Sequence, residues 1–405
     1  MLEVKGKYNI AKIFTDVVDN ETISQIITLL NQEFTQDSKI RIMPDCHAGA
    51  GCVIGTTMKI HNKVVPNLVG VDIGCGMKLV ELGKNNINFE ELDCFIRNNI
   101  PSGMNVNDEV LDNSINLKEL KCFEFLKNDL YLMKSLGSLG GGNHFIEVDK
   151  DDEGNYYLVI HSGSRNLGLQ VAKYYQKKAI EYHKNLIFDK QKEKKSIIEQ
   201  LKKEGKQQLI QKTLKKIDEK LVKTHIPEDL CYVEGPLFDD YIHDMYICQK
   251  FAVINREVIA KKICLFLKLN YNSLNSFETI HNYINMEDMI LRKGAISAYK
   301  DQLVLIPINM RDGCIIGKGK GNADFNYSAP HGAGRLLSRS EAKEKINLED
   351  FEKTMEGIYT TSVNQSTIDE SPFAYKPIES ILENIKDTIE IVKIVKPIYN
   401  FKSSE

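Results

Sequence analysis

Two side chains that commonly bind metal ions occur in the glycine-rich string GVDIGCGM. Asp72 and Cys75 lie three residues apart, among glycines at positions 70, 74 and 76. Glycine's conformational freedom lets such a loop turn a carboxylate and a thiolate toward one point. This pair suits a borderline cation such as Zn²⁺, Mn²⁺, Fe²⁺ or Co²⁺. A tight turn around a buried cysteine has the same pattern, so both interpretations stay open.

Two histidines lie at the ends of what read as neighbouring strands. His144 follows three consecutive glycines in SLGGGNHFIEV, and His161 ends the apolar run of VIHSGSRNLG. A single histidine of this kind is more often a satisfied core or surface residue, but two in this arrangement favour a shared site. Arg165, four residues after His161, offers a guanidinium fork to a phosphate or forms an ordinary surface ion pair.

Two further histidines are accompanied by residues that suit phosphate. His281 and Asn282 precede the string RKGA, in which Lys293 either grips a phosphate or belongs to a solvated basic turn. His331 stands between a proline and Gly-Ala-Gly, ahead of a helix that we expect from about Arg335. Small residues let a bulky ligand approach, and helix N-terminal amides favour anions. His331 is therefore a candidate nucleophile toward phosphorus, or else a histidine that caps the helix.

Familiar nucleotide-binding and hydrolytic motifs are missing from the sequence. There is no G-x-x-x-x-G-K-[ST] string, so a P-loop is excluded as the phosphate cradle. GKGKGN from Gly317 lacks the spacing of a dinucleotide fold, and H-E-x-x-H, G-x-S-x-G and zinc-finger spacings do not occur. The residues alone predict a metal-dependent enzyme of phosphate chemistry with a candidate covalent histidine.

The sequence predicts that the helices and strands which position these residues form one domain with an inserted helical arm. Residues 1–180 alternate short β-branched runs with glycine corners and predict a strand-rich region. Residues 168–224 and 236–268 predict helices. The last third returns to strands and glycine loops, then closes with helical stretches around 340–358 and 376–395. No repeat, low-complexity segment or Pro/Ser linker divides the 405 residues.

The inserted arm at residues 184–223 is rich in lysine. It holds 13 lysines against six acidic residues. This segment is either a basic arm for RNA or DNA phosphates or a solvated helical hairpin with narrow apolar stripes, and we favour the hairpin. The whole chain carries a net charge of −3, which excludes a generally basic nucleic-acid coat.

Composition predicts a folded protein of a reducing compartment. Hydrophobic residues make up 42% and charged residues 27% of the chain, as in ordinary globular proteins. Nine cysteines without a Cys-x-x-Cys pair indicate free thiols. The apolar runs are too short to span a bilayer, and the first residues lack a signal region. We therefore expect a cytoplasmic protein with no membrane partner.

Taken together, the strings resemble the RtcB family of RNA-splicing and repair ligases. The resemblance covers most of the chain apart from the lysine-rich arm. It runs through MPDCHAGAGCVIGT from Met43, GVDIGCGM, SLGGGNHFIEV, HSGSRNLG, YICQKFAVINREVI, the His281–Asn282 pair, RKGA, PHGAGRLLSR and the C-terminal PIYNFK. It implies a single RtcB-type α+β domain over residues 1–405, with mixed sheets, helices and the arm as an insertion.

The resemblance also implies a cleft that holds two Mn²⁺ ions and GTP. Metal ligands would be Asp72, Cys75, His144, His161 and His281, with Cys75 bridging the ions, and His331 would become guanylylated. Guanylate contacts would come from Asn143, His144, Phe145, Ile146, Glu147, His281, Asn282, Pro307, Ile308, Asn309, Met310, Cys314, His331, Gly332, Ala333, Gly334 and Lys402. RNA phosphates would meet Arg165, Lys293 and Arg339.

The implied activity is GTP- and Mn²⁺-dependent RNA ligation in tRNA splicing or RNA repair. His331 would take GMP from GTP and pass it to an RNA 3′-phosphate, opened first where it arrives as a 2′,3′-cyclic phosphate. Attack by a 5′-hydroxyl would then join the ends. Broken or tRNA-like RNA would be the partner, and a monomer is the expected state. The chain departs from the family pattern at Ile308 and Arg311, where relatives more often have glycine, and at Cys314, where they commonly have serine.

Two other functions stay open at this point. The altered loop at 308–314 favours a metal-dependent phosphoesterase or cyclic-phosphate hydrolase on the same scaffold. The basic arm would suit a catalytically silent RNA-binding or tRNA-chaperone module. The five metal-type ligands and His331 favour the ligase, because a silent module has no physical need for cysteine and histidine side chains to converge.

Overall fold

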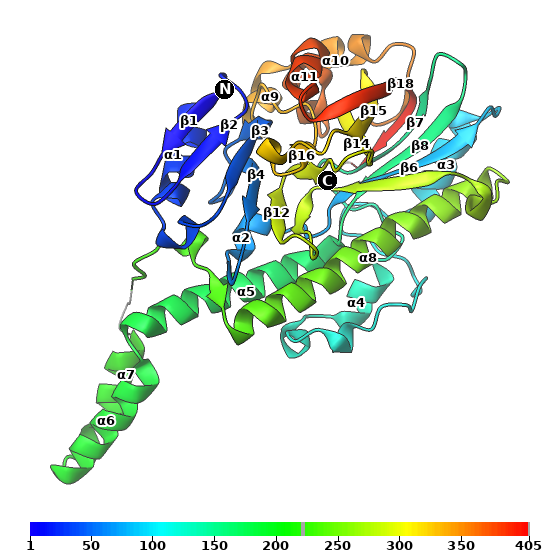
Figure 1. The fold of residues 1–405 in the computed structure, drawn as a ribbon. Helices are drawn as coiled ribbons and strands as arrows, with labels where there is room; N and C mark the ends of the chain where they lie inside the picture. The colour runs from blue at the N-terminus through cyan, green and yellow to red at the C-terminus, as the bar shows by residue number, and fades with distance from the viewer. Residues whose placement is uncertain (220–222, 404–405) are drawn as a thin grey trace.

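Two large β-sheets form the centre of the molecule (Figure 1). The structure is a computed structural model, and it describes residues 1–219 and 223–403. The first sheet has the strand order β1-β2-β3-β4-β12-β11. Its strands are β1 (Leu2–Lys5), β2 (Ile10–Ile13), β3 (Ile40–His47), β4 (Ile54–Lys59), β12 (Ile290–Lys293) and β11 (Asn282–Ile284).

The second sheet carries most of the candidate site, and its main path is antiparallel throughout. Its order is β10 (Ser276–Ile280), β6 (Gly76–Gly83), β8 (Tyr156–Ser162), β7 (Phe145–Lys150), β18 (Ile389–Lys402), β15 (Gly313–Gly319) and β14 (Leu303–Asn309), with β17 (Tyr359–Thr360) paired to β18 off this path. Two small sheets join β5 (Lys63–Val64) to β9 (Val233–Glu234) and β13 (Ala295–Ser297) to β16 (Ser328–Pro330).

Two long helices, α5 (Arg165–Ile187) and α8 (Pro236–Phe266), pack against each other below the sheets in the view of Figure 1. Pro236 opens α8 at a position where its missing N–H costs no hydrogen bond. The shorter helices are α1 (Asn20–Leu30), α2 (Pro66–Val69), α3 (Phe89–Asn99), α4 (Asp129–Lys134), α6 (Lys190–Lys203), α7 (Ile210–Glu219), α9 (Arg339–Lys345), α10 (Leu348–Thr354) and α11 (Ile378–Ile385). This mixture of helices and sheets confirms the predicted α+β class.

Strand β7 shows how the second sheet divides core from site. Ile146 and Val148 are buried on one face, in a cluster with Ile259 of α8. Because side chains alternate along a strand, Phe145, Glu147 and Asp149 turn to the opposite face. One face of β7 therefore builds the core, and the other face is free to build the candidate site.

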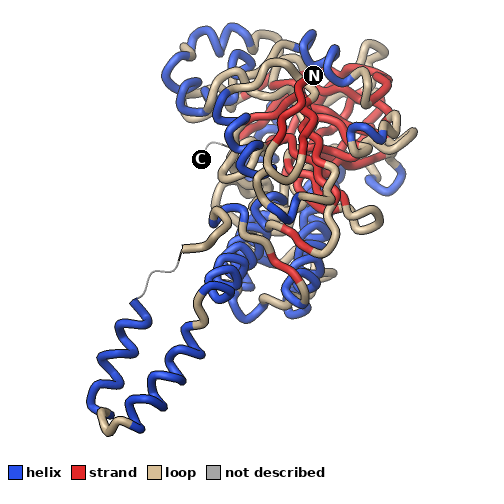
Figure 2. Tube along the Cα trace, turned by 60° about the vertical axis from the view of Figure 1, so that its left-hand side comes forward, coloured by secondary structure: helices blue, strands red, loops and turns tan. Residues whose placement is uncertain are grey.

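The lysine-rich segment forms a helical hairpin that projects from the body (Figure 2). Helices α6 and α7 contact each other, and Gly205, in the left-handed region with φ of +69°, follows the end of α6. Asp189 caps α6 by accepting from the backbone N–H groups of Gln191 and Lys192. Residues 220–222, which belong to the predicted arm, lie outside the described residues.

Two predictions of secondary structure were wrong in part. The stretch 376–395, predicted as helix, holds the short helix α11 and then the first half of β18. The apolar and β-branched residues of β18 place it between β7 and β15, where tertiary pairing overrides local helix propensity. The helix expected from about Arg335 begins instead at Arg339, where Ser338 and Glu341 form a capping box. His331 therefore lies in a turn ahead of α9.

Among the described residues, no helix combines the length and the apolar character needed to cross a bilayer.

Candidate active site

The loop between α2 and β6 brings a carboxylate and a thiol to the end of the second sheet. The backbone N–H of Cys75 donates to the carbonyl of Asp72 over 3.1 Å. Gly74 between them has a φ of +75°, and a Cβ there would lie 2.9 Å from the Cα of Gln249 on α8. Only glycine tolerates this conformation and this close approach. The loop thus has the shape that its glycines predict.

Three of the predicted metal ligands are in direct contact with one another. The Sγ of Cys75 lies 3.4 Å from Nε2 of His144 and 3.4 Å from Nε2 of His161. Sulfur and nitrogen ligands of one tetrahedral ion, at about 2.3 Å and 2.0 Å from it, stand about 3.5 Å apart. All three side chains are buried. The donor types and their spacing therefore fit a divalent cation.

The other two predicted ligands adjoin this trio. Oδ2 of Asp72 lies 3.1 Å from Nε2 of His144, and the His281 ring centroid lies 5.2 Å from that of His161. His281 is fixed to the loop, because its backbone N–H donates to the carbonyl of Cys75 over 2.9 Å. We call Asp72, Cys75, His144, His161 and His281 the metal cluster. Its five side chains come from four separate segments that the sheet brings together.

Backbone groups orient the side chains of the metal cluster. Nδ1 of His144 lies 2.9 Å from the carbonyl of Leu139, and Nδ1 of His161 lies 3.1 Å from the carbonyl of Asn143. Each carbonyl accepts the Nδ1 proton, which leaves Nε2 as the free lone pair that a metal ion requires. The backbone N–H of Ser164 donates to Oδ1 of Asp72 over 3.0 Å. The donor atoms are thus oriented by the fold itself.

The electrostatics of the metal cluster favour neutral imidazoles. Burial lowers the pKa values of His161 and His281 well below the ordinary range, and neighbouring histidines lower them further. Burial and the Asp72 carboxylate raise the pKa of the Cys75 thiol. A bound dication would counter that last effect, because a coordinated thiol gives up its proton. His161 and His281 are therefore already in the neutral form that binds a metal ion.

His331 stands next to the metal cluster and is held by a buried carboxylate. Its ring centroid lies 5.0 Å from that of His281. Oδ2 of Asp45 lies 2.7 Å from Nδ1 of His331 and also accepts the backbone N–H of His331 over 3.1 Å. Nδ1 makes no aligned hydrogen bond among the described residues, so Asp45 fixes the backbone of His331 and places a negative charge beside its ring. Asp45, at the end of β3, had no role assigned by the sequence.

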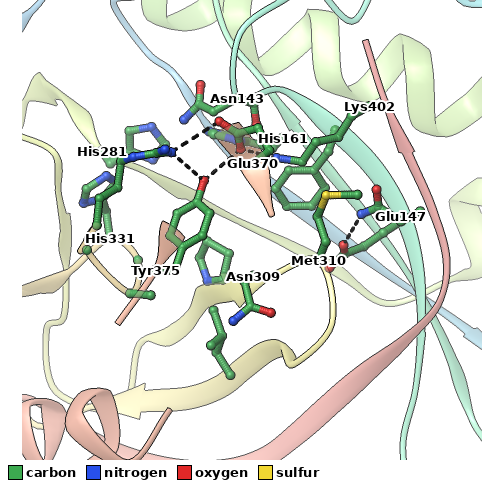
Figure 3. Close-up of a pocket in the computed structure, with 18 of the residues that line it drawn as sticks. Asn143, Glu147, His161, His281, Asn309, Met310, His331, Glu370, Tyr375 and Lys402 are labelled. Atoms are coloured by element: carbon green, nitrogen blue, oxygen red, sulfur yellow. Dashed lines mark hydrogen bonds and ion pairs between the residues drawn. The ribbon is translucent and has the colours of Figure 1, made fainter. Parts of the chain in front are cut away.

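A cavity of about 280 Å³ opens beside His331 and the metal cluster (Figure 3). Its walls come from β7, the end of β14, the end of β18 and the turn after His331. Most of the predicted guanylate contacts line it, namely Asn143, Phe145, Glu147, His281, Pro307, Ile308, Asn309, Met310, His331, Gly332, Ala333, Gly334 and Lys402. The sequence thus named residues that the fold collects around one cavity.

Four of the predicted guanylate contacts lie elsewhere. His144 is in the metal cluster, and Ile146 points into the core on the other face of β7. Asn282 holds the metal loop, because its amide donates to the carbonyl of Asp72 over 3.3 Å and accepts the Gly294 N–H over 3.0 Å. Cys314 is buried behind Glu147, to whose Oε1 its thiol donates over 3.5 Å. None of these four side chains lines the cavity.

The far wall of the cavity carries a charge network that the sequence did not reveal. Glu370 forms an ion pair with Lys402, accepts from Arg339 over 2.8 Å and from the hydroxyl of Tyr375 over 2.8 Å. Burial alone would raise the pKa of Glu370, but Lys402 and Arg339 hold it at about 2. The network fixes the Lys402 ammonium at the cavity wall. Glu370 lies in no motif, so no local signal could have indicated it.

The three predicted RNA-phosphate residues differ in their surroundings. Arg165 donates to the hydroxyl of Ser138 and to the carbonyl of Gly103, and Lys293 is buried and donates to the carbonyl of Asn67 over 2.8 Å. Arg339 is half exposed at the rim of the cavity. Of the three, Arg339 is therefore placed best to meet a phosphate from solvent.

Helix α8 supports the metal cluster with two buried polar residues that sequence reasoning passed over. Arg256 donates to the carbonyl of Gly74 over 2.9 Å and to that of Ser162 over 2.8 Å. Asn255 accepts from the backbone N–H groups of Gly137 and Ser138. Buried polar side chains within a long apolar helix are their only sequence signal. They clamp the loops that carry the cluster's histidines, cysteine and aspartate.

The altered loop at 308–314 leaves the cavity open. Ile308 lines the cavity, but Arg311 does not. The Arg311 guanidinium instead donates to the adjacent Asp312 and, over 2.9 Å, to the hydroxyl of Thr354. The added charge of Arg311 is thus bound outside the cavity.

Comparisons with known proteins agree over most of the chain. A family model described as tRNA-splicing ligase RtcB matches residues 25–132 and 127–403. The RNA-splicing ligase RtcB of Escherichia coli (strain K12) is 29% identical over 399 residues, covering 89% of this chain and 88% of that protein. The tRNA-splicing ligase RtcB of Aeropyrum pernix is 26% identical over 435 residues, covering 84% and 83% respectively. That of Archaeoglobus fulgidus is 24% identical over 473 residues, covering 94% and 90%.

Proposed function

The chain belongs to the RtcB family of RNA ligases, and we propose that it joins RNA ends in a GTP- and Mn²⁺-dependent reaction. The joined ends are a 3′-phosphate, or a 2′,3′-cyclic phosphate opened first, and a 5′-hydroxyl. The reaction proceeds through GMP attached to His331. The observation that carries this proposal is the position of His331, between a buried carboxylate and a cluster of metal-type ligands, on the wall of a ligand-sized cavity.

Two Mn²⁺ ions would be held by the side chains of the metal cluster. Bound there, the ions would neutralise the negative charge of the triphosphate and of the RNA phosphate. The chain itself fixes the donors, through the backbone carbonyls of Leu139 and Asn143 and through the Arg256 clamp. The structure supports this assignment by the donor types and their spacing.

His331 acts as the nucleophile toward GTP. Nε2 forms a bond to the α-phosphorus, and the bond from that phosphorus to the pyrophosphate oxygen breaks. The Asp45 carboxylate, 2.7 Å from Nδ1, stabilises the positive charge that develops on the ring. GMP then passes from Nε2 to the RNA 3′-phosphate, and attack by the 5′-hydroxyl on that activated phosphate releases GMP. The imidazole is regenerated for another cycle.

The cavity binds the guanosine part of the nucleotide. Lys402, held by Glu370, presents an ammonium donor, and Glu147, on the neighbouring strand β7, presents a carboxyl group to the same cavity. The Phe145 ring, 5.5 Å from the Lys402 ammonium, offers an aromatic surface. A donor can meet a ring carbonyl, and an acid group can accept from a ring amine. Together they recognise a base that has both groups, as guanine has. RNA from tRNA splicing or RNA repair is the proposed partner, with Arg339 at the rim as its phosphate contact.

One ground for the cyclic-phosphate hydrolase alternative, the charge of Arg311, does not reach the cavity. That function was motivated by the altered loop at 308–314, yet the Arg311 side chain binds Asp312 and Thr354 instead of entering the cavity. The loop therefore presents no charge that would exclude a nucleotide.

The proposal is tested by RNA joining. A 5′-hydroxyl RNA and a labelled RNA ending in a 3′-phosphate are incubated with GTP and MnCl₂, and the joined product is resolved on a gel. We expect joining by the wild-type chain and none by His331→Ala. Cyclic-phosphate opening without joining in the wild type would overturn the ligase proposal in favour of hydrolysis.

A further inference from the structure

A second group of metal-type ligands lies behind the wall of the cavity, apart from the metal cluster. Glu147 and Asp149 project from the same face of β7, and Cys314 comes from β15, with β18 between these strands. All three side chains are buried, and their ligand atoms lie within 4.8 Å of one another. We call Glu147, Asp149 and Cys314 the acid–thiol cluster. Only Glu147 of the three also lines the cavity.

The spacing in the acid–thiol cluster suits coordination by one small ion. Sγ of Cys314 lies 3.5 Å from Oε1 of Glu147. A sulfur at about 2.3 Å and a carboxylate oxygen at about 2.0 Å from a tetrahedral ion stand about 3.5 Å apart. The other oxygen of Glu147, Oε2, accepts from the amide of Asn400 over 2.8 Å. Asn400 thereby turns Oε1 toward Cys314.

Asp149 is the independent sign that this cluster binds a ligand. Its side chain is 0% exposed, and neither of its carboxylate oxygens accepts a hydrogen bond from a donor among the described residues. None of the ion pairs in the described part of the chain involves Glu147 or Asp149, and the Asn400 amide is the donor that Glu147 meets. Buried carboxyls without donors are rare in proteins, because burial without a partner is unfavourable. A cation would satisfy both acids and the thiol at once.

The acid–thiol cluster differs from an ordinary pair of acids that share one proton. Burial raises the pKa of Glu147 to about 7 and raises the pKa values of Asp149 and Cys314 well above their ordinary ranges. Without a cation, protons neutralise the cluster. One proton shared between the two carboxyls would occupy one oxygen of Asp149, and the thiol would donate to Glu147. A cation would meet the second Asp149 oxygen and the sulfur as well.

We propose that Glu147, Asp149 and Cys314 form a second cation site, which takes a divalent ion of the zinc and cobalt class. A carboxylate–thiolate set favours borderline metals over Mg²⁺ or Ca²⁺. On binding, the Cys314 thiol and any protonated carboxyl release their protons to solvent, and the ion takes their place. The ion enters from the cavity, because Glu147 is the member that reaches its wall. This proposal does not rest on the ligase function, since binding is measured without nucleotide or RNA.

Cobalt makes the site visible, because a thiolate bound to Co²⁺ gives a near-ultraviolet charge-transfer absorption. The full chain is titrated with CoCl₂ as the Cys75→Ser variant, which removes the thiolate of the metal cluster. We expect the absorption to persist in Cys75→Ser with one equivalent of Co²⁺ and to disappear in Cys75→Ser/Cys314→Ser. Cys94→Ser in the Cys75→Ser background is the matched control, because Cys94 is exposed and lies in neither cluster. Its absorption should be unchanged.

Several results would overturn the second site. Equal absorption with and without Cys314, or loss of the absorption in the Cys94 control, would show that cobalt binds other thiols. Where the Cys314 variant fails to fold, Cys75→Ser/Asp149→Asn decides, because it keeps both the thiol and the size of the side chain. We expect its cobalt affinity to fall at least about tenfold. An unchanged affinity would contradict coordination by Asp149.

Discussion

The metal cluster and the acid–thiol cluster share one sheet and similar donor atoms, but they are supported in different ways. In the metal cluster, the spare nitrogens of His144 and His161 face backbone carbonyls, and Asp72 accepts from a backbone N–H. In the acid–thiol cluster, Asp149 accepts no hydrogen bond from a donor among the described residues. The first arrangement is oriented before any ion arrives. The second needs a proton or a cation to become satisfied.

This difference shows which cluster has its donor atoms oriented for catalysis. A reactive centre requires donors held in one geometry throughout a catalytic cycle. The metal cluster meets that requirement and lies beside His331. The acid–thiol cluster touches the cavity only through Glu147, so its state can adjust the cavity wall without taking part in bond formation.

The largest effect should separate the two cysteines. Cys75→Ser should lower RNA joining more than about 100-fold, because it removes a ligand that contacts two histidines. Cys314→Ser should lower it less than about tenfold, since Cys314 does not line the cavity. Joining rates at saturating GTP and Mn²⁺ measure both. Similar losses in the two variants would end the distinction between the clusters.

The next effect concerns the orientation of His331. Asp45→Asn keeps the size of the side chain but cannot stabilise a charged imidazole, so guanylylation should slow by about 10²- to 10⁴-fold. The rate is followed by mass spectrometry during a single turnover. Manganese content should stay unchanged, because Asp45 is not in the metal cluster. A rate within threefold of wild type would remove Asp45 from the mechanism.

A pH effect on stability should mark Glu147 of the acid–thiol cluster, with a sign opposite to that of the buried His161 and His281. The pKa of Glu147 in the folded chain is raised by burial to about 7 from its ordinary value of 4.5. Its contribution to the free energy of unfolding is therefore fully present below pH 4.5 and is lost as the pH rises through about 7. The loss is on the order of 3 kcal/mol. Denaturant unfolding of metal-free protein between pH 5 and 8 measures it.

The control for the pH effect is Glu147→Gln, which should remove the part of the stability loss between pH 5 and 8 that Glu147 causes. Added Co²⁺ should also flatten it, because the ion replaces the protons. A slope that persists unchanged in Glu147→Gln would assign the titration to another group.

A smaller effect should show that α8 supports the metal cluster. Arg256→Gln should weaken Mn²⁺ binding by about 10- to 100-fold, because Arg256 holds the carbonyls of Gly74 and Ser162. Lys78→Gln is the matched control, since Lys78 pairs with the same Glu278 as Arg256 but donates to neither loop. Isothermal titration of Mn²⁺ compares them. Equal weakening in both variants would indicate general destabilisation in place of support.

Local sequence was enough to pair Asp72 with Cys75 and His144 with His161, whereas the set of five came from the family resemblance. The spacing of His144 and His161 placed them on neighbouring strands, and β7 and β8 do pair, with Phe145 opposite His161. The glycines around Cys75 predicted a bent loop, which Gly74 provides. Such signals work because glycine conformation and strand alternation depend on a few adjacent residues.

Long-range partners could not be predicted in the same way. Asp45 meets His331 from 286 residues away, and Glu370 meets Lys402 from 32 residues away, on a segment without a motif. The C-terminal strand β18 was mistaken for helix up to residue 395, because its pairing with β7 and β15 outweighs local propensity. The acid–thiol cluster was missed for the same reason, since Cys314 reaches Glu147 across β18.

The measurement that tests the central claim most directly is the intact mass of the chain after incubation with GTP and MnCl₂. We predict a gain of one guanylate in the wild type, mapped to His331 by peptide fragmentation, and no gain in His331→Ala or without Mn²⁺. A guanylate that persists in His331→Ala, or its absence from wild-type protein with bound manganese, would contradict the role of His331 as nucleophile.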